Sequence, residues 1–288
     1  MLRSSNATPN VDSQRTANPI VTGGSVVGVK YNGGILVAAD TLASYGSLAR
    51  FEGVERIAQI GDAGDTLLAA GGEYSDYQYM LKLIEGMAVE EFAMDDGATM
   101  SPKELHHWLT RVMYNRRSKM DPLWNRCERA RFARRPPPPP PSVARADLRA
   151  APPNPPPQRP LLRRLTRPPR ARSVIIAGFR DGAAYLGTSD LYGTMYEDTF
   201  IATGLGAHMA LPLLRQEWTA EMGEAEARAL LTKCMQVLFY RDTRACSTIQ
   251  IGKVDATGSS ISAPTKLDTY WEHPEFIKGG GHRGDGSW

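Results

Sequence analysis

One segment, Arg126–Arg172, restricts the possible folds of this chain more than any other feature. It holds fourteen of the 21 prolines and thirteen arginines, against two acids, Glu128 and Asp147. Proline fixes φ and removes a backbone donor, so neither a helix nor a sheet can run through this segment. We predict a disordered Pro/Arg-rich insertion. The packed fold must therefore come from the two flanking blocks, and "MDPLWN" before the segment would continue directly into "SVIIAGF" after it.

This segment has three interpretations. Its prolines could form a polyproline ligand for an SH3-type domain, and its arginines could make the chain a nucleic-acid-binding protein. It could also be an insertion without a selected role, such as intron sequence retained in a gene model. Its composition favours the third interpretation, so we expect no nucleic-acid partner.

The rest of the chain has the composition of a soluble globular protein. It has 288 residues, of which 42% are hydrophobic and 23% charged. The basic charge is concentrated in the insertion, so the remainder is acidic. No apolar run approaches the ~18 residues that a membrane span needs, and residues 1–15 lack the apolar stretch of a secretory signal. Three scattered cysteines fit neither a disulfide framework nor a metal site, which favours a reducing intracellular compartment and predicts no metal or cofactor.

Apolar spacing in the two blocks predicts strands, two helices, strands, two helices and a last strand. "NGG" at Asn32–Gly34 is typical of a hairpin turn, and Ser101, Pro102 and Glu104 are typical of a helix start with a capping box. The predicted strands are Ser25–Tyr31, Ile35–Asp40, Glu55–Ile60, Thr66–Ala70, Val174–Phe179, Ala184–Thr188, Tyr196–Ala202 and Thr248–Val254. The predicted helices are Tyr74–Phe92, Pro102–Ser118, Ala207–Trp218 and Glu224–Tyr240. Two stacked sheets with a helix pair on each outer face would bury all of these apolar faces, which predicts an α+β fold in four layers, αββα.

This order of elements resembles the proteasome β-subunit family of N-terminal nucleophile hydrolases. The resemblance covers roughly residues 18–254, apart from the insertion. It rests on the stretches "GSVVGVKYNGGILVAAD", "TLASYGSLARF", "LLAAGGEYSDYQ", "TRVMYNRRSKMDPLWN" and "LPLLR…YRDTR". Because several separated motifs agree in order and spacing, the resemblance is specific.

The resemblance implies a threonine nucleophile at the freed N-terminus of the mature chain, supported by a lysine, an aspartate and an oxyanion-binding glycine. Here the nucleophile position is Gly24, which has no side chain, and the lysine position is Arg56, whose guanidinium cannot shuttle protons. The aspartate and glycine are kept as Asp40 and Gly71. The positions that would orient the α-amine fall on Leu205, Ala207, Asp242 and Ala245. The resemblance therefore predicts an inactive subunit of a threonine-type endopeptidase complex.

An active threonine-type or serine-type peptidase is the alternative. Thr22 and Ser25 flank the empty position and could be substitute nucleophiles. A side chain one residue away along a strand points to the opposite face, so we expect neither to act in this way.

The two ends of the chain are predicted to serve assembly. The resemblance implies that residues 1–15 are a propeptide, cleaved between Arg15 and Thr16, and that residues 16–254 form the β-type domain. Residues 255–288 would be a C-terminal arm, anchored by the aromatic residues Tyr270, Trp271 and Phe276, that reaches the opposite ring. The implied partners are the other α and β subunits of a stacked 28-subunit particle, in the cytoplasm and nucleus, with no membrane partner.

Overall fold

The computed structural model describes residues 20–61, 64–94, 99–119, 123 and 173–270. The predicted insertion, residues 126–172, lies outside this part of the chain, so its predicted disorder stays a prediction. Among the described residues, no helix combines the length and the apolar character needed to cross a membrane.

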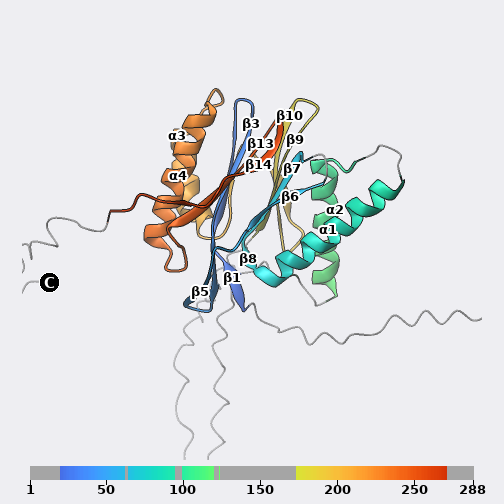
Figure 1. Cartoon of the computed structure of the whole chain (residues 1–288), viewed down its shortest axis with the longest axis horizontal. Coiled ribbons are helices and arrows are strands. Elements are labelled where there is room, and N and C mark those ends of the chain that lie inside the picture. Colours follow the sequence, from blue (N-terminus) through green and yellow to red (C-terminus); the bar gives the residue numbers. More distant parts are fainter. Residues whose placement is uncertain (1–19, 62–63, 95–98, 120–122, 124–172, 271–288) are drawn as a thin grey trace, which may run out of the picture. The chain divides into compact units, whose positions relative to one another are not determined.

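Two large antiparallel sheets lie side by side at the centre of the fold (Figure 1). The strands of the first sheet, in spatial order, are β12 (Phe200–Ala202), β2 (Val26–Tyr31), β3 (Gly34–Asp40), β13 (Thr248–Asp255) and β14 (Gly258–Ile261), with β15 (Thr265–Lys266) also paired to β13. The strands of the second are β11 (Met195–Glu197), β10 (Ala183–Asp190), β9 (Ser173–Arg180), β7 (Thr66–Ala70) and β6 (Ile57–Ile60). The predicted "NGG" turn joins β2 to β3, and Gly33 has a φ of 113° there, which favours glycine.

Each large sheet carries a helix pair on its outer face, which gives the four predicted layers (Figure 1). Helices α3 (Gly206–Glu217) and α4 (Glu224–Arg241) cover the first sheet, and α1 (Tyr74–Met94) and α2 (Pro102–Ser118) cover the second. The predicted capping box is present: the Glu104 amide donates to the Ser101 side chain, and the Ser101 amide donates to the Glu104 carboxylate. The helical pattern in the sequence therefore located all four helices.

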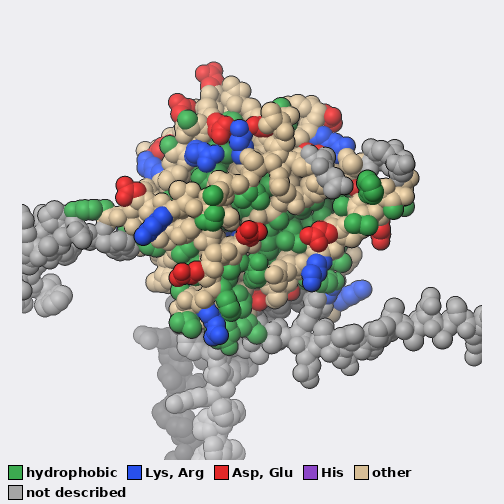
Figure 2. Space-filling model, in the orientation of Figure 1, with side chains coloured by type: hydrophobic (Ala, Val, Ile, Leu, Met, Phe, Trp, Pro, Cys, Tyr) green, Lys and Arg blue, Asp and Glu red, His purple; other side chains and the backbone are tan. Residues whose placement is uncertain are grey.

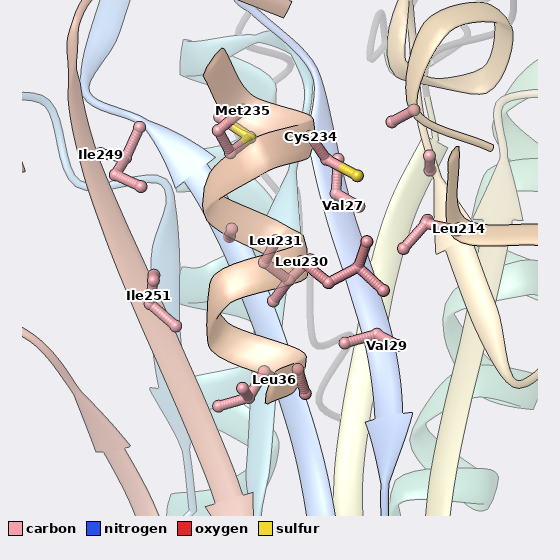
Figure 3. Packing of buried hydrophobic residues seen from close by; sticks show 14 of the residues in the cluster. Val27, Val29, Leu36, Leu214, Leu230, Leu231, Cys234, Met235, Ile249 and Ile251 are labelled. Atoms are coloured by element: carbon pink, nitrogen blue, oxygen red, sulfur yellow. The ribbon is translucent and has the colours of Figure 1, made fainter. Parts of the chain in front are cut away.

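Successive side chains of β2 and β3 point to opposite faces of the sheet, which divides the core into separate clusters. Val26 of β2 and Val37 of β3 point between the sheets, whereas Val27 and Leu36 point toward α3 and α4. Figure 3 shows α4 side chains lying over β2 and β13. A third cluster lies between the second sheet and helices α1 and α2. Both faces of β2 and β3 are thus covered, which explains why these strands are near-continuous apolar runs in the sequence.

Three features of the fold differ from the sequence prediction. Strands β14 and β15 were not predicted, and they pair with β13 although they lie within residues 255–288, which were predicted to be the C-terminal arm. Tyr196–Ala202 was predicted as one strand, but the chain forms β11 and β12, which belong to different sheets. The Asp198 carboxylate accepts a hydrogen bond from the Thr199 amide, and this local contact occupies the break between the two strands.

The third difference is a small additional sheet that the sequence did not predict. Its strands, in spatial order, are β5 (Leu48–Glu52), β4 (Leu42–Tyr45), β1 (Val21–Gly23) and β8 (Gly72–Glu73). All five residues of β5 are exposed, including Leu48 and Phe51. Figure 2 shows hydrophobic side chains gathered at the end of the molecule where Figure 1 places β5 and β1.

Candidate functional site

The first four predicted site positions come together where β1 meets the two large sheets. Gly24 follows β1, Asp40 ends β3, Arg56 precedes β6, and Gly71 lies between β7 and β8. Arg56 connects the group, because its Nη2 donates to the Gly24 carbonyl at 2.7 Å and its Nη1 forms an ion pair with Asp40. Both charged side chains are only 2% exposed. The four positions therefore lie together in one buried cluster.

All five N–H groups of the Arg56 guanidinium have acceptors within this cluster. Nε donates to the Ala70 carbonyl at 3.2 Å, and Nη2 donates to that carbonyl at 3.1 Å as well as to Gly24. Nη1 donates to the Asp40 carboxylate and, at 3.3 Å, to the Asp40 carbonyl. The guanidinium is therefore bound by the protein itself, with its planar fork matched to a carboxylate and three backbone carbonyls.

The glycines of this cluster leave the space that Arg56 and Asp40 occupy. A Cβ atom at Gly23 would lie 2.5 Å from Arg56 Nε, and one at Gly24 would lie 3.0 Å from a carboxylate oxygen of Asp40. A Cβ at Gly71 would lie 2.8 Å from the Gly24 carbonyl oxygen. The backbone and the ion pair are thus packed too closely for larger residues at Gly23 and Gly71 without a shift.

The two alternative nucleophiles, Thr22 and Ser25, are both buried. Ser25 Oγ accepts a hydrogen bond from the Gly206 amide at 3.0 Å, where α3 begins. Its oxygen therefore accepts from an amide at the start of α3 that also donates to the Thr203 carbonyl at 3.0 Å. Thr22 pairs with Ser44 of β4 and Glu73 of β8. In these positions both residues have structural contacts.

The remaining site positions lie at helix ends, where their contacts are local. Leu205 is the residue before α3 and packs against the core beneath α3 and α4. Asp242 follows α4, and its side chain accepts from the Arg244 amide at 3.0 Å, while its carbonyl accepts from the Ala245 amide at 3.1 Å. The carboxylate thus stabilises a turn. Their predicted correspondence to amine-orienting residues stays a prediction.

Strand β1 is a part of the site that the sequence did not predict. It pairs antiparallel with β4 on one side and with β8 on the other, so Gly23 lies between Ala43 and Gly72. The chain segment that leads into Gly24 therefore fills the space between two strand edges. A short β-branched run, Val21–Thr22, was the only local signal for it in the sequence.

Of the two predicted assembly segments, the propeptide lies wholly outside the described residues, and the C-terminal arm is described as far as Tyr270. Arg15, Thr16, Trp271 and Phe276 lie outside the described residues. Tyr270 lies within them and is 64% exposed, and its amide donates to Tyr240 Oη at 2.8 Å. Gln236 of α4 also donates to the Asp268 carbonyl at 2.7 Å. Residues 268–270 of the predicted arm therefore contact α4, and Tyr270, with its exposed aromatic side chain, ends the described segment.

A second buried polar group lies between α2 and β10. His106 is fully buried, and its Nδ1 lies 2.7 Å from Tyr185 Oη, within hydrogen-bonding distance. Thr110 donates to the His106 carbonyl at 2.8 Å, and its hydroxyl lies 3.0 Å from that of Ser189. Burial lowers the pKa of His106 and raises the pKa of Tyr185 to about 12. These contacts connect α2 to β10 of the second sheet. The elements that form this cluster differ from those that surround Gly24.

The fold and the site together define a class of protein. Mixed helices and antiparallel sheets, with a short N-terminal strand leading to Gly24, are consistent with an α+β sandwich of the N-terminal nucleophile hydrolase type. Residues 20–126 and 158–254 match the family model described as "Proteasome subunit". The chain therefore belongs to the proteasome subunit family, as its motifs predicted. Most of the predicted insertion, residues 127–157, has no match in that model.

Individual relatives agree with this assignment and with the more specific resemblance to beta type-4 that "SYGSLARF" and "YNRRSKMDPLWN" indicated. "Proteasome subunit beta type-4" of Xenopus laevis is 40% identical, and the alignment covers 92% of this chain and 90% of the relative. The Arabidopsis thaliana protein of the same name is 37% identical, with 92% and 88% covered. "Proteasome subunit beta type-7" of Saccharomyces cerevisiae is 31% identical, with 96% and 88% covered.

Proposed function

We propose that this chain is a non-catalytic structural β subunit of the 20S proteasome core particle, at the beta type-4 (β7) position. It would complete a β ring, help to enclose the chamber, and help to join two half-particles that carry out ATP- and ubiquitin-dependent protein degradation. Its relatives' names and their near full-length alignments support this role. The proposed location is the cytoplasm and nucleus.

The observation that carries the non-catalytic part of the proposal is the Gly24 position itself. Attack on a peptide carbonyl by a chain of this type requires a side-chain nucleophile at that position. Glycine supplies none. The group that would replace the family's lysine is the Arg56 guanidinium, and all of its N–H groups are used by Asp40, Gly24 and Ala70. The contacts that Arg56 makes at this position therefore stabilise the fold.

The C-terminal arm gives a test of the assembly role. A chain that ends at Tyr270 lacks Trp271 and Phe276, and a control chain that ends at Gly279 keeps both. We expect the chain ending at Tyr270 to accumulate in half-particles and the control to enter full 28-subunit particles, because aromatic anchors carry much of the binding energy of an interface. Native mass spectrometry of particles purified through a tag on this chain measures both species. Recovery of either chain alone, without other proteasome subunits, would contradict the proposed function.

The predicted propeptide has its own test. We propose that a neighbouring active subunit cleaves the chain between Arg15 and Thr16, which leaves a short extension before Gly24. N-terminal sequencing of the chain from assembled particles is expected to begin at Thr16. An N-terminus at Met1 or at Gly24 would show that this cleavage does not occur.

A further inference from the structure

In the small sheet, the backbone pairing between β1 and β8 is very short. Strand β8 has only two residues, Gly72 and Glu73, because α1 begins at Tyr74. The backbone pairing of β1 with β8 therefore stops at the pair Thr22–Glu73. The two residues that precede Thr22 have no further β8 residues to pair with, so a backbone amide in this segment needs another acceptor.

The Glu73 side chain supplies that acceptor. Its Oε2 accepts from the Ile20 amide at 2.5 Å and from the Val21 amide at 3.2 Å, and Oε1 lies 3.3 Å from the same Val21 amide. One carboxylate thus accepts from two consecutive backbone amides at the start of β1. Hydrogen bonds from backbone N–H groups to a carboxylate are stronger than those to a neutral acceptor.

The carboxylate is itself held in place. Ser75, in the first turn of α1, donates to Glu73 Oε1 at 2.9 Å, and Glu73 is only 8% exposed. Burial raises the pKa of Glu73, while the hydrogen bonds from Ser75, Val21 and Ile20 act in the opposite direction. The side chain is therefore fixed from the α1 side and directed at the segment that enters β1.

We propose that Glu73 is the positioning residue that latches residues 20–23 into the small sheet as an intramolecular strap. With the strap in place, the facing edges of β4 and β8 are both used by the chain itself. An extended peptide that bound by strand addition would need those same edges. The strap therefore keeps the approach to Gly24 and Arg56 closed, and it would hold a processed N-terminal extension on the subunit.

The latch follows from contacts within one chain, so its test does not depend on the proposed function. Amide hydrogen exchange with residue-level resolution is measured on the full chain and on four variants, Glu73→Ala, Glu73→Gln, Ser75→Ala and Glu52→Ala. Glu52 is the matched control, since it is an exposed carboxylate on β5 of the same sheet. Exchange at individual amides reports local opening.

We expect Glu73→Ala to speed exchange at Ile20 and Val21 by about tenfold or more, because two hydrogen bonds to a charged group are lost. Glu73→Gln keeps one acceptor oxygen and is expected to give a smaller increase, Ser75→Ala a smaller one still, and Glu52→Ala none. Amides of β2 and α1 should keep the rates of the parent chain. The proposal is overturned if Glu73→Ala leaves Ile20 and Val21 within about twofold of the parent chain, or if β2 and α1 accelerate to the same degree, since the residue would then act on overall stability.

Discussion

Two polar side chains are buried against glycines in different parts of the fold, and they differ in charge. A Cβ at Gly23 would lie 2.5 Å from Arg56 Nε, and a Cβ at Gly187 would lie 2.5 Å from His106 Nδ1. Arg56 forms an ion pair and donates to backbone carbonyls, whereas His106 meets a tyrosine hydroxyl. In both places a glycine leaves room for a polar side chain to approach the backbone closely. The groups around that side chain decide whether it can be buried as a charged group.

The largest expected effect comes from removing the charge of Arg56 alone. Arg56→Met leaves the buried Asp40 carboxylate without its cationic partner, and we expect a loss of about 3–5 kcal/mol in the free energy of unfolding. The double variant Arg56→Met/Asp40→Leu removes both charges and should lose less than the sum of the two single variants. Urea unfolding of the full chain measures all three. A loss under about 1 kcal/mol for Arg56→Met would mean that the buried pair is not a main support of this region.

The second effect tests the role of the glycines in both regions. Gly23→Ala and Gly187→Ala each force a methyl group into contact with Arg56 or His106, and we expect each to cost about 1–3 kcal/mol. Gly86→Ala is the control, because a Cβ there meets nothing within 4 Å on helix α1, and alanine should stabilise the helix by about 0.5–1 kcal/mol. Thermal unfolding ranks the three variants. Equal effects at all three positions would show that space is not the reason for the glycines.

The third and smallest effect separates the neutral cluster from the charged one by pH. Burial, reinforced by His107, lowers the pKa of His106 below its ordinary value of 6.5, although Glu197 and a backbone contact at Thr188 oppose the shift. The unfolded chain therefore binds the proton more tightly than the folded chain. Stability from this group is complete above pH 6.5 and falls as the pH decreases through 6.5 toward the lower folded pKa.

Urea unfolding between about pH 8 and about pH 5.5 covers this range, where histidine is the side chain whose ordinary pKa lies within it. His106→Gln should flatten the pH dependence. The double variant Arg56→Met/Asp40→Leu should keep the slope of the parent chain, because it removes the charged cluster without leaving a buried carboxylate unpaired. An unchanged slope in His106→Gln would assign the pH dependence to other groups.

Most of the fold was predictable because its signals are local. Helical spacing and the capping box at Ser101 placed the four helices, and apolar runs placed most strands of the two large sheets. Strands β14 and β15 were missed, and β11 and β12 were predicted as a single strand. The small sheet was not predictable in this way, since β1 pairs with residues near Ser44 and Glu73 that lie far along the chain. The exposed strand β5 also lacks the apolar alternation of a half-buried strand.

The residues of the site also divide into those that the sequence indicated and those that it did not. Gly24, Asp40, Arg56 and Gly71 lie at or beside strand ends, and the structure brings them together. Their correspondence to the family's catalytic positions stays a prediction. Asp242 lies after a helix end, where its contacts are with its own turn. Glu73 could not be identified from the sequence, because its role depends on where β8 ends and α1 begins.

The central claim is that this chain has no nucleophilic side chain at the Gly24 position. One measurement tests this claim most directly. Assembled particles that contain the chain are treated with an electrophile selective for N-terminal threonine, and the intact mass of every subunit is then recorded. We predict labelled masses for the catalytic β subunits and an unchanged mass for this chain, because Gly24 offers no hydroxyl group at the nucleophile position. The proposed cleavage would leave Thr16 at the N-terminus, but Thr16 precedes the nucleophile position in the sequence, and the electrophile is chosen to react only with threonine activated at that position. A mass increase on this chain, mapped to its N-terminus, would contradict the claim.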